Sequence, residues 1–257
     1  MTRTQFSRAM ARVMIDAKGG DALRNRVVLV TGAGQGIGRT AAIFFARHGA
    51  TVVLHGRNVT KLESVYDAIV AAGDAQPAIV PLDLAQASDR DFDNVAEAIH
   101  ARLGRLDGIL HNAALGVVPS PLRTQTSEQW LSLLRVNLVA PFALTRACLP
   151  LLEAAPDAAV VLTSETHGPA PAAFWGAFSI AKGALLSLAT IWTQELEHAP
   201  HLRINVLVPG PVNSPQRSRT HPGEEKLGLR MPESLMPTYL YWIGAESRGQ
   251  SGNLVRC

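Results

Sequence analysis

Short apolar runs rich in β-branched residues alternate along the chain with longer stretches in which apolar residues recur every three or four positions. The runs predict six strands, at 27–30, 51–54, 78–80, 108–110, 159–162 and 204–208, with 254–255 as at most a short seventh. The spacing of three or four residues between apolar positions predicts helices over 40–46, 59–72, 91–103, 127–153, 174–196 and 233–244. Pro141 is a candidate kink in the fourth of these helices. Strands that are apolar throughout and alternate with helices are typical of a parallel sheet buried on both faces.

We therefore predict an α/β fold with a doubly wound parallel sheet of six to seven strands and helices on both faces. Neither a repeat nor a linker divides residues 24–257, so we expect one domain there. Residues 1–23 carry four basic side chains against few acids and are predicted to form a basic N-terminal arm or an extra helix. The polar stretch 213–230 is long for a connection and is predicted to be a lid or binding loop.

Composition narrows the classes of protein that need to be considered. The chain has 257 residues, 47% of them hydrophobic, which suits one domain with a full core. A net charge of +3 is too small to indicate nucleic-acid binding, and the apolar runs are shorter than a membrane span requires. Cys148 and Cys257 form no disulfide framework and fit a reducing, cytoplasmic setting, and we predict no metal site.

The first strand leads into a glycine-rich turn that opens a helix, Thr31-Gly-Ala-Gly-Gln-Gly-Ile-Gly38. Glycines in such a turn let the backbone approach a pyrophosphate, and the following helix offers its free N–H groups and positive dipole end. The position of the turn, between a strand and a helix at the head of an alternating chain, makes it a strong indication of a Rossmann fold. The predicted cofactor-binding residues of this turn are Gly32, Gly34, Gln35, Gly36, Ile37 and Gly38.

The second strand ends in His55-Gly56-Arg57-Asn58, where an NAD site usually has an acid that holds the ribose hydroxyls. No acid is present there, and the guanidinium of Arg57 would pair with a 2′-phosphate. We therefore expect Arg57 and Asn58 to contact the cofactor and NADP(H) to be favoured over NAD(H).

Across residues 24–256 the chain resembles the short-chain dehydrogenase/reductase family, whose motifs it carries in order. The turn described above matches the family's TGxxxGxG motif. Residues 83–84 match its adenine-contacting Asp-Leu/Val pair. Residues 111–114 match an altered NNAG motif, and residues 209–214 match the PGxVxT motif. The resemblance implies these further cofactor-binding residues: Asp83, Leu84, Asn112, Ala113, Lys182, Pro209, Gly210, Val212 and Ser214. Relatives also imply a homodimer or homotetramer built on the two long helices.

The same resemblance implies a catalytic tetrad, and here the chain departs from the family. Asn137 and Lys182 match the family's asparagine and lysine, but its YxxxK tyrosine falls on Phe178 and its serine, thirteen residues earlier, on Glu165. The family's tyrosine moves the proton that accompanies hydride transfer between nicotinamide and a carbonyl or alcohol. Phenylalanine has no proton to give, so catalysis through that position is lost.

Three interpretations stay open at this point. In an oxidoreductase with impaired or rewired catalysis, Glu165 is the sharpest replacement acid, ahead of His167 and Ser164, unless it forms an ion pair with Lys182. In a non-catalytic protein, NADP(H) would bind without turnover, as in a sensor, scaffold or partner subunit. In a structural relic nothing would bind. Phe174 and Trp175 are predicted either to line a substrate pocket or to pack at a helix start.

Overall fold

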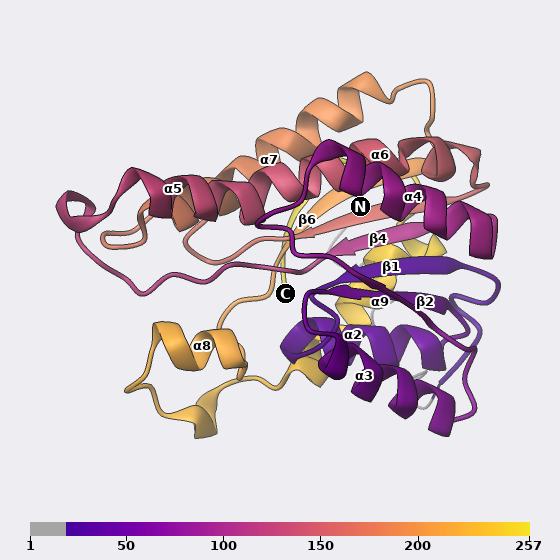
Figure 1. Ribbon diagram of the computed structural model, residues 1–257, viewed down its shortest axis with the longest axis horizontal. Coiled ribbons are helices and arrows are strands. Elements are labelled where there is room, and N and C mark those ends of the chain that lie inside the picture. Colours follow the sequence, from indigo (N-terminus) through magenta and orange to yellow (C-terminus); the bar gives the residue numbers. More distant parts are fainter. Residues whose placement is uncertain (1–18) are drawn as a thin grey trace.

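The computed structural model describes residues 19–257, so most of the predicted N-terminal arm or helix, 1–23, lies outside the described residues. Seven parallel strands form one sheet in the order β3-β2-β1-β4-β5-β6-β7 (Figure 1). They are β1 (Val27–Thr31), β2 (Thr51–Gly56), β3 (Ala78–Pro81), β4 (Gly108–His111), β5 (Ala158–Thr163), β6 (Leu202–Val208) and β7 (Leu254–Arg256). The predicted doubly wound sheet is confirmed, and the short run at 254–255 is its seventh strand.

Helices cover both faces of the sheet, as the fully apolar strands predict. One face carries α2 (Gly36–Arg47), α3 (Val59–Ala71) and α9 (Met236–Ile243), and the other carries α4 (Asp89–Leu103), α6 (Ala140–Ala154) and α7 (Gly176–Glu195) (Figure 1). Alternate residues of each strand enter the two hydrophobic cores, so that Leu29 packs on the α4 side and Val28 on the α2 side. The sheet is thereby covered on both faces, and the loops at its carboxyl end lie outside the two cores.

The predicted helix over 127–153 is one helical stretch with an irregular middle. It comprises α5 (Ser127–Leu134), the π-helical segment η2 (Arg135–Val139) and α6. Pro141 has no N–H to give to the carbonyl of Asn137, so the regular α-helical bond is missing where the π turn ends. The candidate kink therefore takes the form of a π turn that contains Asn137.

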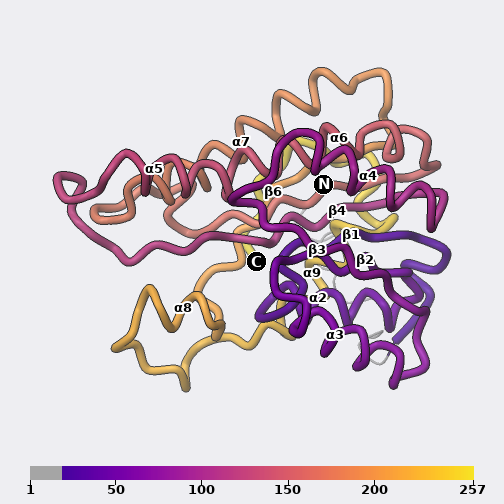
Figure 2. Tube along the Cα trace, in the orientation of Figure 1, coloured from indigo at the N-terminus to yellow at the C-terminus, as the bar shows by residue number. Residues whose placement is uncertain are grey.

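The polar segment 213–230 is not a structureless loop. It contains α8 (Pro215–Thr220) and the 3-10 turn η3 (Lys226–Gly228), and a parallel bridge between Val212 and Arg230 closes its base. The tube in Figure 2 shows α8 and α5 both extending beyond the same end of the sheet. Shorter 3-10 turns are η1 (Leu122–Thr124), η4 (Pro232–Leu235) and η5 (Ala245–Ser247).

Two helical stretches meet the length and hydropathy of a membrane span, 127–154 and 176–195. The sequence contains no unbroken apolar run of that length, because the two helices interleave apolar positions with a few polar ones. Both stretches pack on the sheet, and about half of the apolar window of the first is buried in the domain. Such partial burial is typical of helices that cover a sheet.

Candidate functional site

The site begins where the glycine-rich turn after β1 meets the segment after β4, its neighbour in the sheet. Thr31 Oγ1 accepts hydrogen bonds of 3.0 Å from the backbone N–H groups of both Asn112 and Ala113. Gly32 has a φ of +67°, and a Cβ on it would lie 2.9 Å from the Cα of Ala113. Only glycine fits this position, so the turn and the Asn112 segment are locked together at the switch point of the sheet.

The start of α2 is open. Its N-cap residue Gln35 makes no side-chain capping bond, and its first turn holds no acidic residue. The side chain of Gln35 is turned instead toward Lys61, whose Nζ donates to its Oε1 at 2.7 Å. The first N–H groups of α2 are therefore left without a side-chain partner, and this cradle, floored by glycines, fits a pyrophosphate.

The segments after β2 and β3 place the residues predicted for the adenosine end. Arg57 is exposed at the end of β2, whereas Asn58 caps α3 by accepting a 3.0 Å hydrogen bond from the backbone of Lys61. Asp83 Oδ1 accepts from the backbone N–H of Ala85 at 3.0 Å, and Leu84 is buried in the core beneath α4. The Arg57 side chain is thus the one best placed to meet an anionic ligand, while Asn58 and Leu84 have structural partners.

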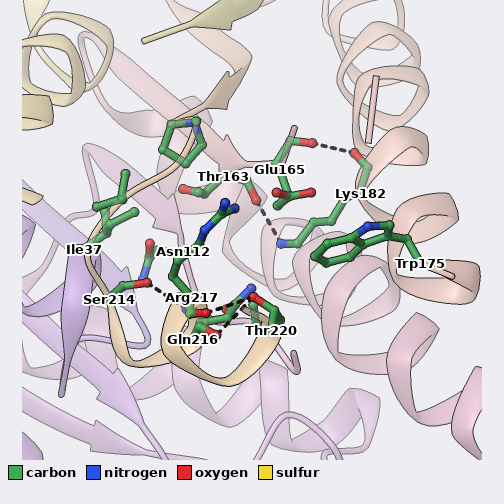
Figure 3. A pocket seen from close by; sticks show the side chains of 15 residues that line it. Ile37, Asn112, Thr163, Glu165, Trp175, Lys182, Ser214, Gln216, Arg217 and Thr220 are labelled. Carbon is green, nitrogen blue, oxygen red and sulfur yellow. Dashed lines mark hydrogen bonds between the residues drawn. The ribbon is translucent and has the colours of Figure 1, made fainter. Parts of the chain in front are cut away.

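A pocket opens at the carboxyl end of the sheet, between the segments after β1, β4, β5 and β6 and the first turns of α7 (Figure 3). Predicted residues that line it are Ile37, Asn112, Glu165, Lys182, Pro209, Gly210, Val212 and Ser214. Sequence reasoning missed Thr163, Gln216 and Thr220, whose types and spacing carried no signal. The structure thereby joins motifs from five separate parts of the chain in one cavity.

Lys182 lies deep in this pocket, 4% exposed, on the first half of α7. Its Nζ donates to the carbonyl of Thr163 at 2.9 Å, and its own carbonyl accepts from Ser164 Oγ at 2.8 Å. Burial lowers the pKa of Lys182 to about 8, and the negative charge of Glu165 offsets this only in part. A Cβ on Gly168 would lie 2.7 Å from Ser164 Oγ, so glycine there allows the loop after β5 to pack against Lys182.

Phe178 and Asn137 are both fully buried, and neither lines the pocket. Phe178 packs with Leu133 and Trp175, and the Nζ of Lys182 is 6.0 Å from its ring centroid. The amide of Asn137 donates to the carbonyls of Leu115 and Leu133 at 2.9 Å each, while its buried Oδ1 has no protein partner in the described part of the chain. Asn137 therefore braces the loop after β4, and Phe178 contributes a purely apolar wall behind Lys182.

Glu165 is paired with His167 and not with Lys182. Its Oε2 accepts from the His167 backbone at 2.7 Å and from the His167 Nδ1 at 2.9 Å, whereas no Glu165–Lys182 ion pair forms among residues 19–257. The alternative that Glu165 forms an ion pair with Lys182 is therefore wrong for the described structure. The tight turn after Glu165 brings His167 within hydrogen-bond distance instead. The His167 ring stacks on Trp175 with centroids 4.1 Å apart.

Trp175 and Phe174, adjacent in sequence, have different environments. Trp175 is buried, lines the pocket and lies 5.7 Å from the ring of His221, which belongs to the segment after α8. Phe174 has a φ of +75° and is exposed, so its side chain points away. Of the two predicted pocket residues, the structure therefore assigns only Trp175 to the cavity.

Arg217 of α8 also lines the pocket. Its guanidinium makes two hydrogen bonds to Glu224, of 2.7 and 2.6 Å, and this pairing raises the pKa of Arg217 and lowers that of Glu224. Ser214 caps α8 by accepting from the Arg217 backbone at 3.2 Å. Within the described residues the charge of Arg217 is therefore already balanced by a carboxylate of its own segment.

Two histidines lie beneath the site at the ends of β2 and β4. Burial lowers the pKa of His55 to about 4 and that of His111 to about 3, the latter with help from the nearby His55 and Lys182 charges. His111 Nε2 lies 2.9 Å from Thr145 Oγ1, whereas the ring nitrogens of His55 have no partner of good geometry in the described region. Both rings are therefore neutral at physiological pH.

Comparison with known proteins agrees with this geometry. A model of the short chain dehydrogenase family matches residues 26–225. The uncharacterised oxidoreductase YciK of Escherichia coli K12 is 38% identical over 232 residues, 90% of this chain and 91% of YciK.

Two solved structures are similar over 92% of this chain and 98% of theirs, each with a TM-score of 0.88. One is a short chain dehydrogenase from Shigella flexneri complexed with NADP, at 37% identity. The other is from Escherichia coli CFT073 complexed with NADPH, at 38% identity. The chain belongs to the short-chain dehydrogenase family.

Proposed function

We propose that this protein binds NADP(H) in preference to NAD(H) and is an oxidoreductase whose catalysis is rewired relative to its family. The observation that carries the proposal is that the open start of α2 leads into a pocket that retains Lys182 but offers no phenol. The family's chemistry is hydride transfer between nicotinamide and a carbonyl or alcohol.

The residues that would hold the cofactor are distributed along the carboxyl end of the sheet. The N–H groups of α2 would bind the pyrophosphate, and Arg57, with Lys61 beside the same turn, would bind the 2′-phosphate. Lys182 Nζ would hold the ribose next to the nicotinamide, near Val212 and Ser214. The NADP and NADPH complexes of two relatives support NADP(H) as the cofactor.

The hydroxyl groups nearest Lys182 do not replace a catalytic phenol. Ser164 Oγ is engaged with the Lys182 carbonyl, and Thr163 Oγ1 lies 3.3 Å from the hydroxyl of Tyr239, behind the pocket. Phe178 has no donor, and a positioned general acid is typically worth about 10²–10⁴-fold in rate. Ordinary carbonyl reduction should therefore be slow in this protein.

The cofactor proposal is tested by titrating the purified protein with NADPH and NADH and following nicotinamide fluorescence. NADPH should bind at least about tenfold more tightly, since a charge-assisted contact to the 2′-phosphate is lost with NADH. Arg57→Ala should remove most of this preference, whereas Arg90→Ala, which removes an exposed arginine of α4, should not. Equal affinity for the two cofactors would refute the NADP(H) preference.

The second candidate function is a protein that binds NADP(H) without turnover, as a sensor, scaffold or partner subunit. The closed apolar cluster around Phe178 favours this second function, because no side chain in the cluster can donate or accept the proton of the reaction. A screen of aldehydes, ketones and alcohols with wild type and with the double variant Glu165→Ser/Phe178→Tyr separates the two. Turnover that appears only in the double variant supports a non-catalytic wild-type protein.

We further propose that the protein acts in the cytoplasm as a homodimer or homotetramer, with a small-molecule substrate and no nucleic-acid or membrane partner. Both cysteines are free, which suits a reducing compartment. Large apolar side chains are exposed along α6 and α7, among them Phe142, Ile180 and Ile191. Light scattering after gel filtration measures the mass, and a monomer would refute the oligomer.

A further inference from the structure

The nitrogen of Lys182 is largely free of hydrogen-bond partners although it belongs to the wall of the pocket. Among the described residues that line the pocket, Lys182 carries the one primary amine. Its Nζ donates to the Thr163 carbonyl at 2.9 Å, and the two other N–H groups of the ammonium have no protein acceptor in the described part of the chain. Figure 3 shows the side chain extending from α7 into the pocket beside Glu165. A small ligand in the pocket can therefore reach this nitrogen.

The surroundings of the Lys182 nitrogen favour the neutral amine. Lys182 is 4% exposed, and the ring centroid of Phe178 lies 6.0 Å from its Nζ. Burial lowers the pKa of Lys182 from 10.5 to about 8. A shift of this size raises the fraction of neutral amine at neutral pH roughly 300-fold over that in the unfolded chain. Because only the neutral amine has a lone pair, the pocket supplies far more of the nucleophilic form than a solvated lysine does.

The charged groups around Lys182 leave this preference in place. Glu165, on the segment after β5, is the one carboxylate among the described residues that line the pocket, and its charge offsets the effect of burial on the pKa of Lys182 only in part. Arg217 of α8 is positively charged and is paired with Glu224. His111, at the end of β4, is neutral at physiological pH because burial lowers its pKa to about 3.

We infer that Lys182 is a covalent binding site, at which the cofactor-free protein captures aldehydes as an imine of the Nζ. The hydrogen bond to the Thr163 carbonyl persists in the neutral amine, which keeps two N–H groups, and it turns the lone pair away from that carbonyl. Trp175 and Ile37 give the pocket apolar surface against which the alkyl chain of an aldehyde packs. The inference goes beyond the proposed function, in which the same nitrogen holds a ribose, and does not depend on it.

The covalent step balances with the protein and the aldehyde alone. The Nζ lone pair forms a C–N bond to the carbonyl carbon, while the C=O π pair moves to the oxygen. One proton then passes from the nitrogen to that oxygen and gives a carbinolamine. The second N–H proton is lost as the C–O bond breaks, so that water leaves and the C=N bond of the imine forms. Glu165, the carboxylate of the same cavity, carries these protons between nitrogen and oxygen.

Reductive trapping tests the inference without any turnover by the protein. The cofactor-free full chain is treated with propanal and sodium cyanoborohydride, which reduces each imine to a stable propyl amine, and the modified lysines are located by peptide mass mapping. At neutral pH Lys182 should be labelled at least about tenfold faster than the exposed Lys61 and Lys226 of the same molecule. In urea the three lysines should react at the same rate. If Lys182 of the folded protein is labelled no faster than the two exposed lysines, the inference is overturned.

The pH dependence of the labelling gives a second readout. Labelling of Lys182 should reach half of its maximum near pH 8 in the folded protein, and should still be rising there in urea, where the ordinary pKa of 10.5 applies. A midpoint that does not move on unfolding also overturns the inference.

A third arm separates the inference from the proposed function. Saturating NADPH should slow the labelling of Lys182 and leave that of Lys226 unchanged, because the proposed function places the cofactor ribose on the Lys182 nitrogen. Fast labelling of Lys182 that NADPH does not slow supports the inference and refutes that placement of the ribose.

Discussion

The two ends of the parallel sheet differ in how far their buried polar groups are paired. At the end where the strands begin, Asp157 receives hydrogen bonds from both Arg26 and Arg203, and Arg26 also donates to the carbonyls of Asp107 and Asp157 at 3.1 and 3.0 Å. Arg203 further donates to Ser247 Oγ and to the Gly244 carbonyl. Two buried guanidinium groups thus share the Asp157 carboxylate, with Arg26 Nε left without a partner in the described residues, and the cluster ties the starts of β1, β5 and β6 together.

At the end where the strands finish, buried groups lack partners. Lys182 has a single hydrogen bond from its ammonium, Asn137 Oδ1 has none, and neither ring nitrogen of His55 is paired within the described residues. Unpaired buried groups are unfavourable in the isolated protein. One end of the sheet therefore pairs most of its buried polar groups, whereas at the other end Lys182 lines the pocket with an ammonium group that a ligand can still contact.

The largest effect is expected from breaking the matched cluster. Asp157→Ala leaves Arg203 and Arg26 buried without their counter-ion and should lower the free energy of unfolding by about 3–5 kcal/mol. Urea denaturation measures this, with Glu97→Ala as the control that loses only an exposed ion pair to Arg90. Similar losses in the two variants would show that the cluster is not specially stabilising.

The same cluster has a defined pH dependence. Burial alone would raise the pKa of Asp157, but the hydrogen bonds from Arg203 and Arg26 prevail and lower it from 3.8 to about 2. Its stabilisation is therefore complete above pH 3.8 and is lost as pH falls through about 2. At neutral pH the cluster should contribute its full effect.

At the opposite end, Lys182→Met should stabilise the isolated protein by about 1–3 kcal/mol, because it removes a buried charge whose pKa is lowered from 10.5 to about 8. Below pH 8 Lys182 is charged in both the folded and the unfolded chain, so burying the charge lowers the stability of the wild-type protein by its full amount. Between pH 8 and 10.5 the folded chain loses the proton first, so the advantage of the variant should shrink as pH rises.

Urea denaturation at neutral and alkaline pH measures that difference, and calorimetric titration with NADPH should show weaker binding by the variant. A variant that is less stable than wild type at neutral pH would contradict the view that Lys182 is retained for a ligand.

His55 is expected to make the protein sensitive to mild acid. As pH falls from 6.5 to about 4, the unfolded chain binds a proton on this residue and the folded chain does not, so stability decreases across that window. The loss from this residue is about 2 kcal/mol near pH 5. His55→Leu should flatten the dependence of the urea midpoint on pH, whereas His100→Leu on the exposed side of α4 should leave its slope unchanged.

The fold was largely predictable because apolar runs and glycine-rich turns are local signals. The boundaries that shifted depend on tertiary context: α7 begins at Gly176 because Phe174 adopts a positive φ, and the helix around Asn137 is π-helical ahead of Pro141. In the site, motif positions such as Ser214 and Lys182 were predictable from the resemblance. The partner of Glu165 was not, since the choice between His167 and Lys182 depends on the turn after β5.

The smallest effects are expected at the starts of α4 and α2, which differ in how they are capped. Ser88 caps α4 in a reciprocal pair with Asp91, so Ser88→Ala should lower the free energy of unfolding by about 1 kcal/mol. Gln35 stands at the same position of α2 and caps nothing, so Gln35→Ala, which removes only an exposed hydrogen bond to Lys61, should change it by less than about 0.5 kcal/mol. Inorganic pyrophosphate should then raise the melting temperature of wild type and Gln35→Ala alike, because the backbone N–H groups of α2 bind it and the side chain does not. We therefore propose that the uncapped start of α2, at the end of the sheet that carries the pocket, takes its cap from the ligand.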